Sequence, residues 1–121
     1  MSRMKDGVLL RIFIGEADCL ESAPIYDLIL TMAKKSGLMG ATIVRGVASF
    51  GQAGDTHTAK LLRIAEDLPL VIEIVDKEDH ISKFVTELDN IFAKAKCGGT
   101  IALMPVKMKC YADNSTDQLL K

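Results

Sequence analysis

Residues 8–14 read VLLRIFI and residues 70–75 read LVIEIV, two short runs in which nearly every side chain is apolar. Such runs are typical of central strands, which meet little water on either face. An amphipathic stretch and then another apolar run follow each of them, over residues 8–48 and again over residues 70–107. The chain therefore repeats one strand-helix-strand pattern twice.

The two amphipathic stretches carry their apolar residues on one side. These residues recur three and four positions apart, as in a helix that packs against a sheet. The first set is Ile25, Leu28, Ile29, Met32 and Ala33, and the second is Ile81, Phe84, Val85, Leu88, Phe92 and Ala95. Two β-α-β units predict an α+β fold, a ferredoxin-like split βαβ repeat with a four-stranded antiparallel sheet and two helices on one face. Many unrelated functions share this architecture.

Glycine and proline mark the expected element ends. Ser22 or Pro24 begins the first helix, and Gly37 ends it in the left-handed conformation that glycine adopts at little cost. We expect Gly98 to end the second helix. The second strand is predicted over about residues 41–48, and the last over 100–106. Pro105 in that last strand lacks an N–H group, which predicts a place at the sheet edge.

Alternation along the central strands suggests how the chain assembles. If Leu10, Ile12 and Ile14 face the helices, the other face carries Leu9 and Phe13, with Val71 and Val75 from the other central strand. Arg11 and Glu73 lie among them and are placed to pair across neighbouring strands. Both helices cover the opposite face, so this apolar face has no partner within the chain, and such faces usually mark an interface. We therefore predict a homo-oligomer with its sheet faces turned inward.

Composition limits the classes of function. The 121 residues, 49% of them apolar, are enough for one core without metal or disulfides, which predicts one domain over residues 1–112 and a flexible tail over 113–121. A formal net charge of −1 argues against broad binding to nucleic acid or anionic lipid. Three cysteines without CxxC spacing indicate reduced thiols in a cytoplasmic protein.

The longest polar stretch within the domain is residues 49–60, a connection between two strands. Loops of this length in small domains are often functional, and the alternative is a hairpin tip with no role. Gly51 and Gly54 allow backbone N–H groups to approach a ligand, while Gln52 offers a hydrogen bond. No Walker sequence is present, because Gln52 follows Gly51 where that motif requires Lys.

A second candidate is the turn at residues 97–100, Cys-Gly-Gly-Thr, between the second helix and the last strand. Consecutive glycines can form a nest of N–H groups that binds phosphate. An ordinary helix stop explains Gly98 equally well, so both interpretations stay open.

Metal binding and catalysis have less support. His57 lies in the polar loop near Asp55, and His80 lies beside Glu78 and Asp79, but no HxxxH or HExxH pair is present. For nucleophilic catalysis Cys19, Cys97 or Cys110 would need a neighbouring base, which no sequence pattern supplies. Methionines such as Met39 and Met108 are expected to pack rather than to ligate metal.

A family resemblance adds to these observations. The order β-α-β, long loop, β-α-β, with GLMGATIVRG at residues 37–46 and LPLVIEIV at residues 68–75, resembles the PII signalling proteins, above all the PII-like branch of bacteria and archaea. The resemblance covers about residues 5–111. It implies a non-catalytic cytoplasmic homotrimer that binds adenine nucleotides in clefts between subunits. It also implies that the long loop contacts a target, such as a membrane transporter or a cytoplasmic protein.

The resemblance also implies roles for single residues. Those implied to bind ligand are Gly40 and Thr42 on the adenine side, Gly51 and Gln52 at the loop base, and Gly98, Gly99 and Thr100 in a phosphate-holding turn. The implied partner loop, about residues 50–60, includes Phe50, Gly54, Asp55, His57 and Lys60.

The sequence departs from the PII pattern in its charges. Thr100 stands where PII proteins have a basic residue after the turn, and Lys107-Met108-Lys109 is the nearest analogue of their arginine pair. A monophosphate, a cyclic nucleotide or another small anion is therefore as compatible as a triphosphate. Two alternatives to the sensor are a divalent-metal-binding ferredoxin-like trimer and, less favoured, a small enzyme with its site at a subunit interface.

Overall fold

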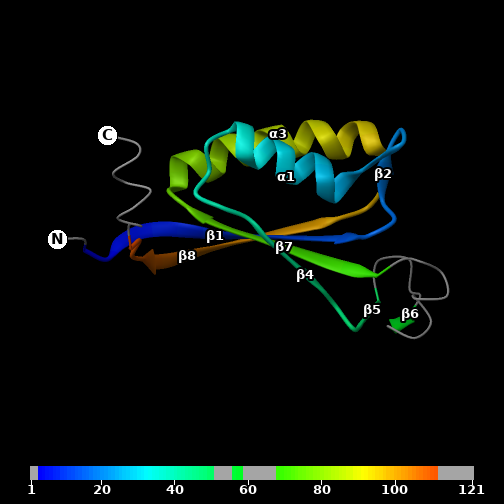
Figure 1. The fold of residues 1–121 in the computed structure, drawn as a ribbon, viewed down its shortest axis with the longest axis horizontal. Coiled ribbons are helices and arrows are strands. Elements are labelled where there is room, and N and C mark those ends of the chain that lie inside the picture. The colour runs from blue at the N-terminus through cyan, green and yellow to red at the C-terminus, as the bar shows by residue number, and fades with distance from the viewer. Residues whose placement is uncertain (1–2, 51–55, 59–67, 112–121) are drawn as a thin grey trace.

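Four strands form one antiparallel sheet in the order β4-β7-β1-β8. This computed structural model describes residues 3–50, 56–58 and 68–111. The four strands are β1 (Lys5–Gly15), β4 (Thr42–Arg45), β7 (Pro69–Asp76) and β8 (Thr100–Met108). Figure 1 shows both helices, α1 (Ile25–Lys35) and α3 (Glu78–Ala95), on one side of this sheet. The predicted α+β, ferredoxin-like class is confirmed.

Short ladders stand outside the main sheet. β2 (Cys19–Leu20) pairs with β3 (Ala23–Pro24) in the connection that leads into α1. β5 (Ala48–Phe50) pairs with β6 (Thr56–Thr58) beyond the end of β4, as Figure 1 shows. The strand predicted over residues 41–48 is therefore wrong in its second half. Gly46 donates its N–H to the carbonyl of Pro69, where β7 begins, so the main sheet offers β4 no partner beyond this point.

The core lies between the sheet and the helices. Alternate side chains of β1 and β7 are almost fully buried, because they point toward the helices: Leu10, Ile12, Ile14, Leu70, Ile72 and Ile74. They meet the apolar sides of the two helices, whose buried residues are Ile25, Ile29, Ala33, Ile81, Phe84 and Leu88. The predicted helix stripes are confirmed.

Neither helix covers the other face of the sheet, which we call the open face. Its central pair is Arg11 and Glu73, cross-strand partners whose Nε and Oε2 atoms are 2.7 Å apart. The pairing predicted for these two residues is thus confirmed. Around them lie apolar side chains of all four strands: Leu9, Phe13, Val44, Val71, Val75 and Met104. Phe13 is 41% exposed and Val44 is 50% exposed, so nothing within the described part of the chain covers this face.

The helix ends differ in how well the sequence predicts them. Pro24 is the N-cap of α1, and Gly37 follows that helix with φ of 75°, both as predicted. The prediction that Gly98 ends α3 is wrong. The helix stops at Ala95, and Lys96 takes the left-handed conformation with φ of 57° and ψ of 23°. The chain therefore turns out of the helix before it reaches the glycines.

Candidate functional site

The described residues that were predicted to bind ligand lie at opposite edges of the sheet. Thr42, in β4, shares a row with Glu73, Arg11 and Ala102 across the four strands. Gly98, Gly99 and Thr100 lead into β8 at the other edge. Three gaps between neighbouring strands place the two edges about 14 Å apart. A single chain therefore does not bring the two groups together.

The cross-strand neighbours also show which predicted residues lie at the same end of the sheet. Thr100 lies in one row with Phe13, Val71 and Val44, so the glycine turn and the last residues of β4 stand at the same end of the sheet. Gly40 lies at the other end, because its neighbour Met39 contacts Asp76, the last residue of β7. Gly40 and the glycine turn are thus at diagonal corners.

The predicted loop is described only in part. Phe50 pairs with Thr56, and His57 pairs with Ser49, in the β5-β6 ladder. Gly51, Gln52, Gly54, Asp55 and Lys60 lie outside the described residues. The roles given to them stay predictions.

The two glycines of the turn have different surroundings. A Cβ atom at Gly98 would meet no atom within 4 Å, whereas one at Gly99 would lie 2.8 Å from Cε1 of Phe92 and 3.4 Å from the carbonyl oxygen of Phe13. Gly99 thus has a packing reason of its own, because the aromatic ring leaves no room for a side chain. Gly98 and Thr100 are exposed, so their polar groups are accessible to a ligand.

The turn packs beside the connection that follows β1. Cys97 is half-buried, and this burial, with the nearby carboxylate of Asp18 and thiol of Cys19, raises its pKa. Asp18 in turn accepts a hydrogen bond of 2.8 Å from the N–H of Gly15. A thiol with a raised pKa is a poor nucleophile at neutral pH.

Sequence reasoning missed a cation at this end of the sheet. Arg45 ends β4 and forms an ion pair with Glu16, which raises the pKa of the guanidinium. The Arg45 side chain is 63% exposed and follows directly on the row that contains Thr100. A guanidinium binds phosphate well. The signal was available, because Arg45 lies in the same GLMGATIVRG stretch as Gly40 and Thr42.

Asp76 joins the segment that carries Gly40 to the start of α3. Its carboxylate is only 2% exposed and accepts hydrogen bonds from the N–H groups of Met39 at 2.9 Å and Lys77 at 2.7 Å. A third contact, of 2.8 Å, joins it to Nδ1 of His80. Burial raises the pKa of Asp76, but these hydrogen bonds lower it more, so that it lies below its ordinary value. Asp76 is thus a buried residue that holds these two segments together.

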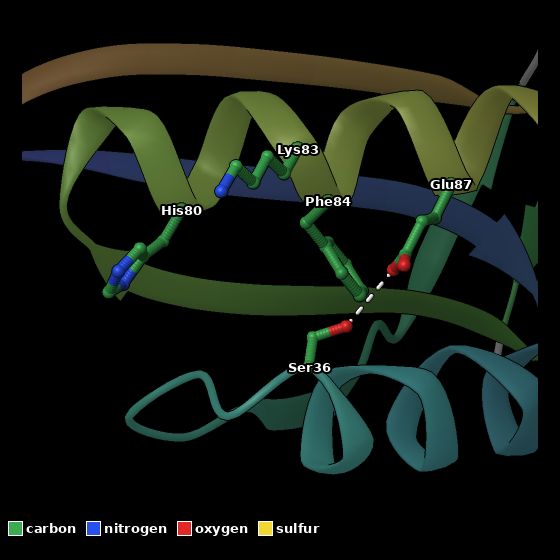
Figure 2. A pocket seen from close by; sticks show the side chains of 5 residues that line it. All are labelled: Ser36, His80, Lys83, Phe84 and Glu87. Atoms are coloured by element: carbon green, nitrogen blue, oxygen red, sulfur yellow. Dashed lines mark hydrogen bonds between the residues drawn. The ribbon is translucent and has the colours of Figure 1, made fainter.

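A cavity of about 310 Å³ lies on the helix side, far from the open face. Figure 2 shows Ser36, at the end of α1, facing Phe84 and Glu87 of α3. The Ser36 hydroxyl donates a hydrogen bond of 3.0 Å to Glu87, and His80 and Lys83 line the same cavity. The Nδ1 contact with Asp76 fixes the His80 ring and leaves Nε2 as its other polar atom.

The described residues contain no cluster of three His, Cys, Asp or Glu side chains that could hold a metal ion. No helix within them is long and apolar enough to cross a membrane. His57 is described only as part of a strand pair and Asp55 is not described, so the predicted metal alternative gains no support here.

Comparison with known proteins gives a family match. Residues 7–108 match the model of the family described as DUF190, Uncharacterized ACR, COG1993. A UPF0166 protein of Aquifex aeolicus (strain VF5) is 38% identical over 100 residues, which are 83% of this chain and 90% of that protein. A UPF0166 protein of Methanocaldococcus jannaschii is 31% identical over 80 residues, which are 66% of this chain and 73% of that protein.

Comparison of folds points to PII-like proteins. CPII of Thiomonas intermedia K12, a nitrogen regulatory PII-like protein solved with ADP, AMP and bicarbonate, superposes with a TM-score of 0.69. The match covers 88% of this chain and 91% of CPII at 15% identity. The apo form of CPII matches 92% of this chain and 100% of that one, with a TM-score of 0.60 and 14% identity. The fold of this chain is therefore PII-like.

Proposed function

Because this chain belongs to the DUF190 family and has a PII-like fold, we propose that it is a non-catalytic regulatory protein of the PII-like kind. It acts as a cytoplasmic homotrimer that binds an adenine nucleotide, or another small anion, in the clefts between subunits. The loop at residues 50–60 contacts a target, such as a membrane transporter or a cytoplasmic protein, and transmits the binding of the ligand to it.

The observation that supports this proposal most is that the predicted ligand residues lie far apart within one chain. Thr42 and the turn at Gly98 and Gly99 occupy opposite edges of one sheet. A ligand that contacts both groups at once would therefore take them from two different subunits. This need for a second copy is consistent with a ligand site between subunits, and CPII, which shares the fold, has been solved with ADP and AMP.

Each group has a chemical role in this proposal. The exposed N–H groups at Gly98 and Gly99 bind phosphate oxygens, as nests of backbone donors do. Arg45 lies in β4, like Thr42, and so comes from the neighbouring subunit. Its guanidinium supplies positive charge in place of the basic residue that PII proteins have at the position of Thr100. Gly40 and Thr42 from the neighbouring subunit line the base, and Gly51 and Gln52 close the site at the base of the loop.

The proposal is tested by calorimetric titration of the full chain with ADP, AMP, cyclic AMP and ATP, alongside sedimentation of the free protein. We expect a trimer that binds at least one of these nucleotides. At a concentration 100 times the dissociation constant, that nucleotide should stabilise the protein by about 2.7 kcal/mol.

A matched pair of variants locates the site. Gly98→Asp places a carboxylate in the turn, while Gly98→Asn has nearly the same shape without the charge, and open space surrounds both. We expect the Asp variant to lose at least about tenfold in nucleotide affinity through charge repulsion, with the Asn variant close to wild type. A trimer that binds none of the nucleotides, or equal affinity in both variants, contradicts the proposed site.

A further inference from the structure

Figure 1 shows the end of the sheet where β1 begins and β8 ends. A small cavity at this end is lined by three sulfur-containing side chains. They are Met39, from the connection after α1, and Met108 and Cys110, from the end of β8 and just beyond it. The cavity holds about 90 Å³, the room of about three water molecules. Its remaining lining residues are Arg3, Lys5 and Lys77.

Two of the sulfur atoms lie close enough to share one ion. The Cys110 thiol donates to the Met39 thioether with Sγ and Sδ 3.4 Å apart. Two sulfur ligands, each about 2.3 Å from one metal ion, lie at most about 4.6 Å apart. The observed separation is inside this limit without any movement of the backbone.

Met108 reaches the same cavity from a fixed position. Its Sδ atom lies over Gly7, so close that a Cβ atom on that glycine would be 2.6 Å away. Met108 and Cys110 are two residues apart, the spacing that places side chains on one side of an extended chain. Met39 completes the set from the opposite wall, where its N–H group is held by the buried carboxylate of Asp76.

Ligand chemistry and charge select the ion. Thiolate and thioether ligands favour Cu(I) over harder ions. When Cu(I) binds, Cys110 gives up its thiol proton to solvent and one Cu–S bond forms, while the two thioethers donate lone pairs without losing a proton. The thiolate and a monovalent ion are together neutral, so the three cations of the wall meet no added charge. A divalent ion such as Zn(II) would add one positive charge beside Arg3, Lys5 and Lys77.

We propose that Met39, Met108 and Cys110 form a binding site for one Cu(I) ion per chain. The three ligands of this site all come from one subunit, and none of them belongs to the glycine turn. The site also changes the interpretation of Met39 and Met108, which by sequence alone are expected only to pack.

The test begins from a parent variant, Cys19→Ser with Cys97→Ala, which keeps Cys110 as its one thiol. Cu(I) is titrated anaerobically into this full-length chain against a chromogenic Cu(I) chelator, and the first coordination shell is measured by X-ray absorption. We expect one Cu(I) per chain with sulfur neighbours only. Addition of Cys110→Ser should abolish binding, and Met39→Leu or Met108→Leu should each weaken it at least about tenfold.

Met104→Leu is the matched control, because Met104 lies in β8 on the open face and does not line the cavity. Circular dichroism and thermal melting of each variant show whether it folds, and the exposed position of Cys110 makes a loss of folding there unexpected. Undiminished Cu(I) binding after Cys110→Ser would overturn the proposal. So would Met39→Leu and Met108→Leu variants that bind as tightly as the parent, or Zn(II) binding as tight as Cu(I) binding.

Discussion

At the scale of single residues, the side chain of Asp76 holds two backbone segments together. Its buried carboxylate accepts hydrogen bonds from Met39, Lys77 and His80, and so joins the segment that contains Gly40 to the first turn of α3. A sequence signal for this role exists in hindsight. Asp76 comes directly after a strand, and His80 follows it at the i,i+4 spacing of a helix.

We predict that Asp76→Asn destabilises the protein by about 2 kcal/mol at pH 7, since the amide cannot accept three hydrogen bonds and places donors against donors. Urea unfolding measures this loss. Asp79→Asn is the control, because Asp79 is exposed in the same helical turn. A loss in the control as large as that in Asp76→Asn would show that only the charge near the helix start matters.

The difference in stability between wild type and Asp76→Asn should depend on pH, because the pKa of Asp76 is lowered in the folded state. As pH falls, the unfolded chain takes up the proton first, so the stabilisation is complete above about pH 4. It is lost as pH falls further, through the pKa of the folded state. The gap between wild type and Asp76→Asn should therefore narrow below pH 4, and a constant gap would contradict the assignment.

At the scale of elements, the end of α3 shows a conformation that the sequence does not favour. Lys96 has φ of 57°, and a side chain in this region costs about 1 kcal/mol relative to glycine. The nearby pair Gly98 and Gly99 led sequence reasoning to place the helix end too late. The chain leaves the helix before these glycines, and Gly99 packs against the ring of Phe92.

Lys96→Gly is predicted to stabilise the protein by about 1 kcal/mol, because it removes the left-handed strain at the helix end. Lys94→Gly, two residues earlier and within α3, should instead destabilise it by about 1 kcal/mol, the cost of glycine inside a helix. The two variants are compared by urea unfolding. Equal effects of the same sign would show that Lys96 is not strained in solution.

The two central strands and the two helices could be predicted from the distribution of apolar residues along the sequence. Continuous apolar runs identified β1 and β7, and residues three and four apart identified the buried sides of α1 and α3. Strand alternation even predicted the pair Arg11 and Glu73. The pattern of apolar residues does not show where a strand loses its neighbour in the sheet. For this reason the sequence did not predict that β4 ends at Arg45.

At the scale of the whole molecule, contacts outside the pairing of the central strands were beyond sequence reasoning. Met39 and Cys110 are neighbours only because the sheet order sets the connection after α1 beside the end of β8. The same order separates Thr42 from the glycine turn, although the family resemblance assigns both to one kind of ligand. The candidate site was thus predicted as a set of residues, and its division between two edges emerged from the topology.

The open face gives the prediction for assembly. We expect Phe13→Glu to dissociate the oligomer, since a carboxylate buried between subunits without a partner costs about 3 kcal/mol or more, about a hundredfold in the dissociation constant. Phe13 is 41% exposed in the single chain, so the variant should still fold. Sedimentation measures the mass, and Ser82→Glu on the outer side of α3 is the control. A wild-type chain that sediments as a monomer at micromolar concentration would contradict the prediction.

The edge strand β8 has a further consequence, for aggregation. Pro105 offers no N–H group, and Lys107 beside it is largely exposed, with 70% of its side chain accessible. Proline and lysine on an edge strand discourage the addition of strands from other molecules. The opposite edge, β4, spans only four residues. Neither edge is a good template for fibre growth, so concentrated samples should stay free of amyloid, and replacement of Pro105 by a β-branched residue would remove one of these safeguards.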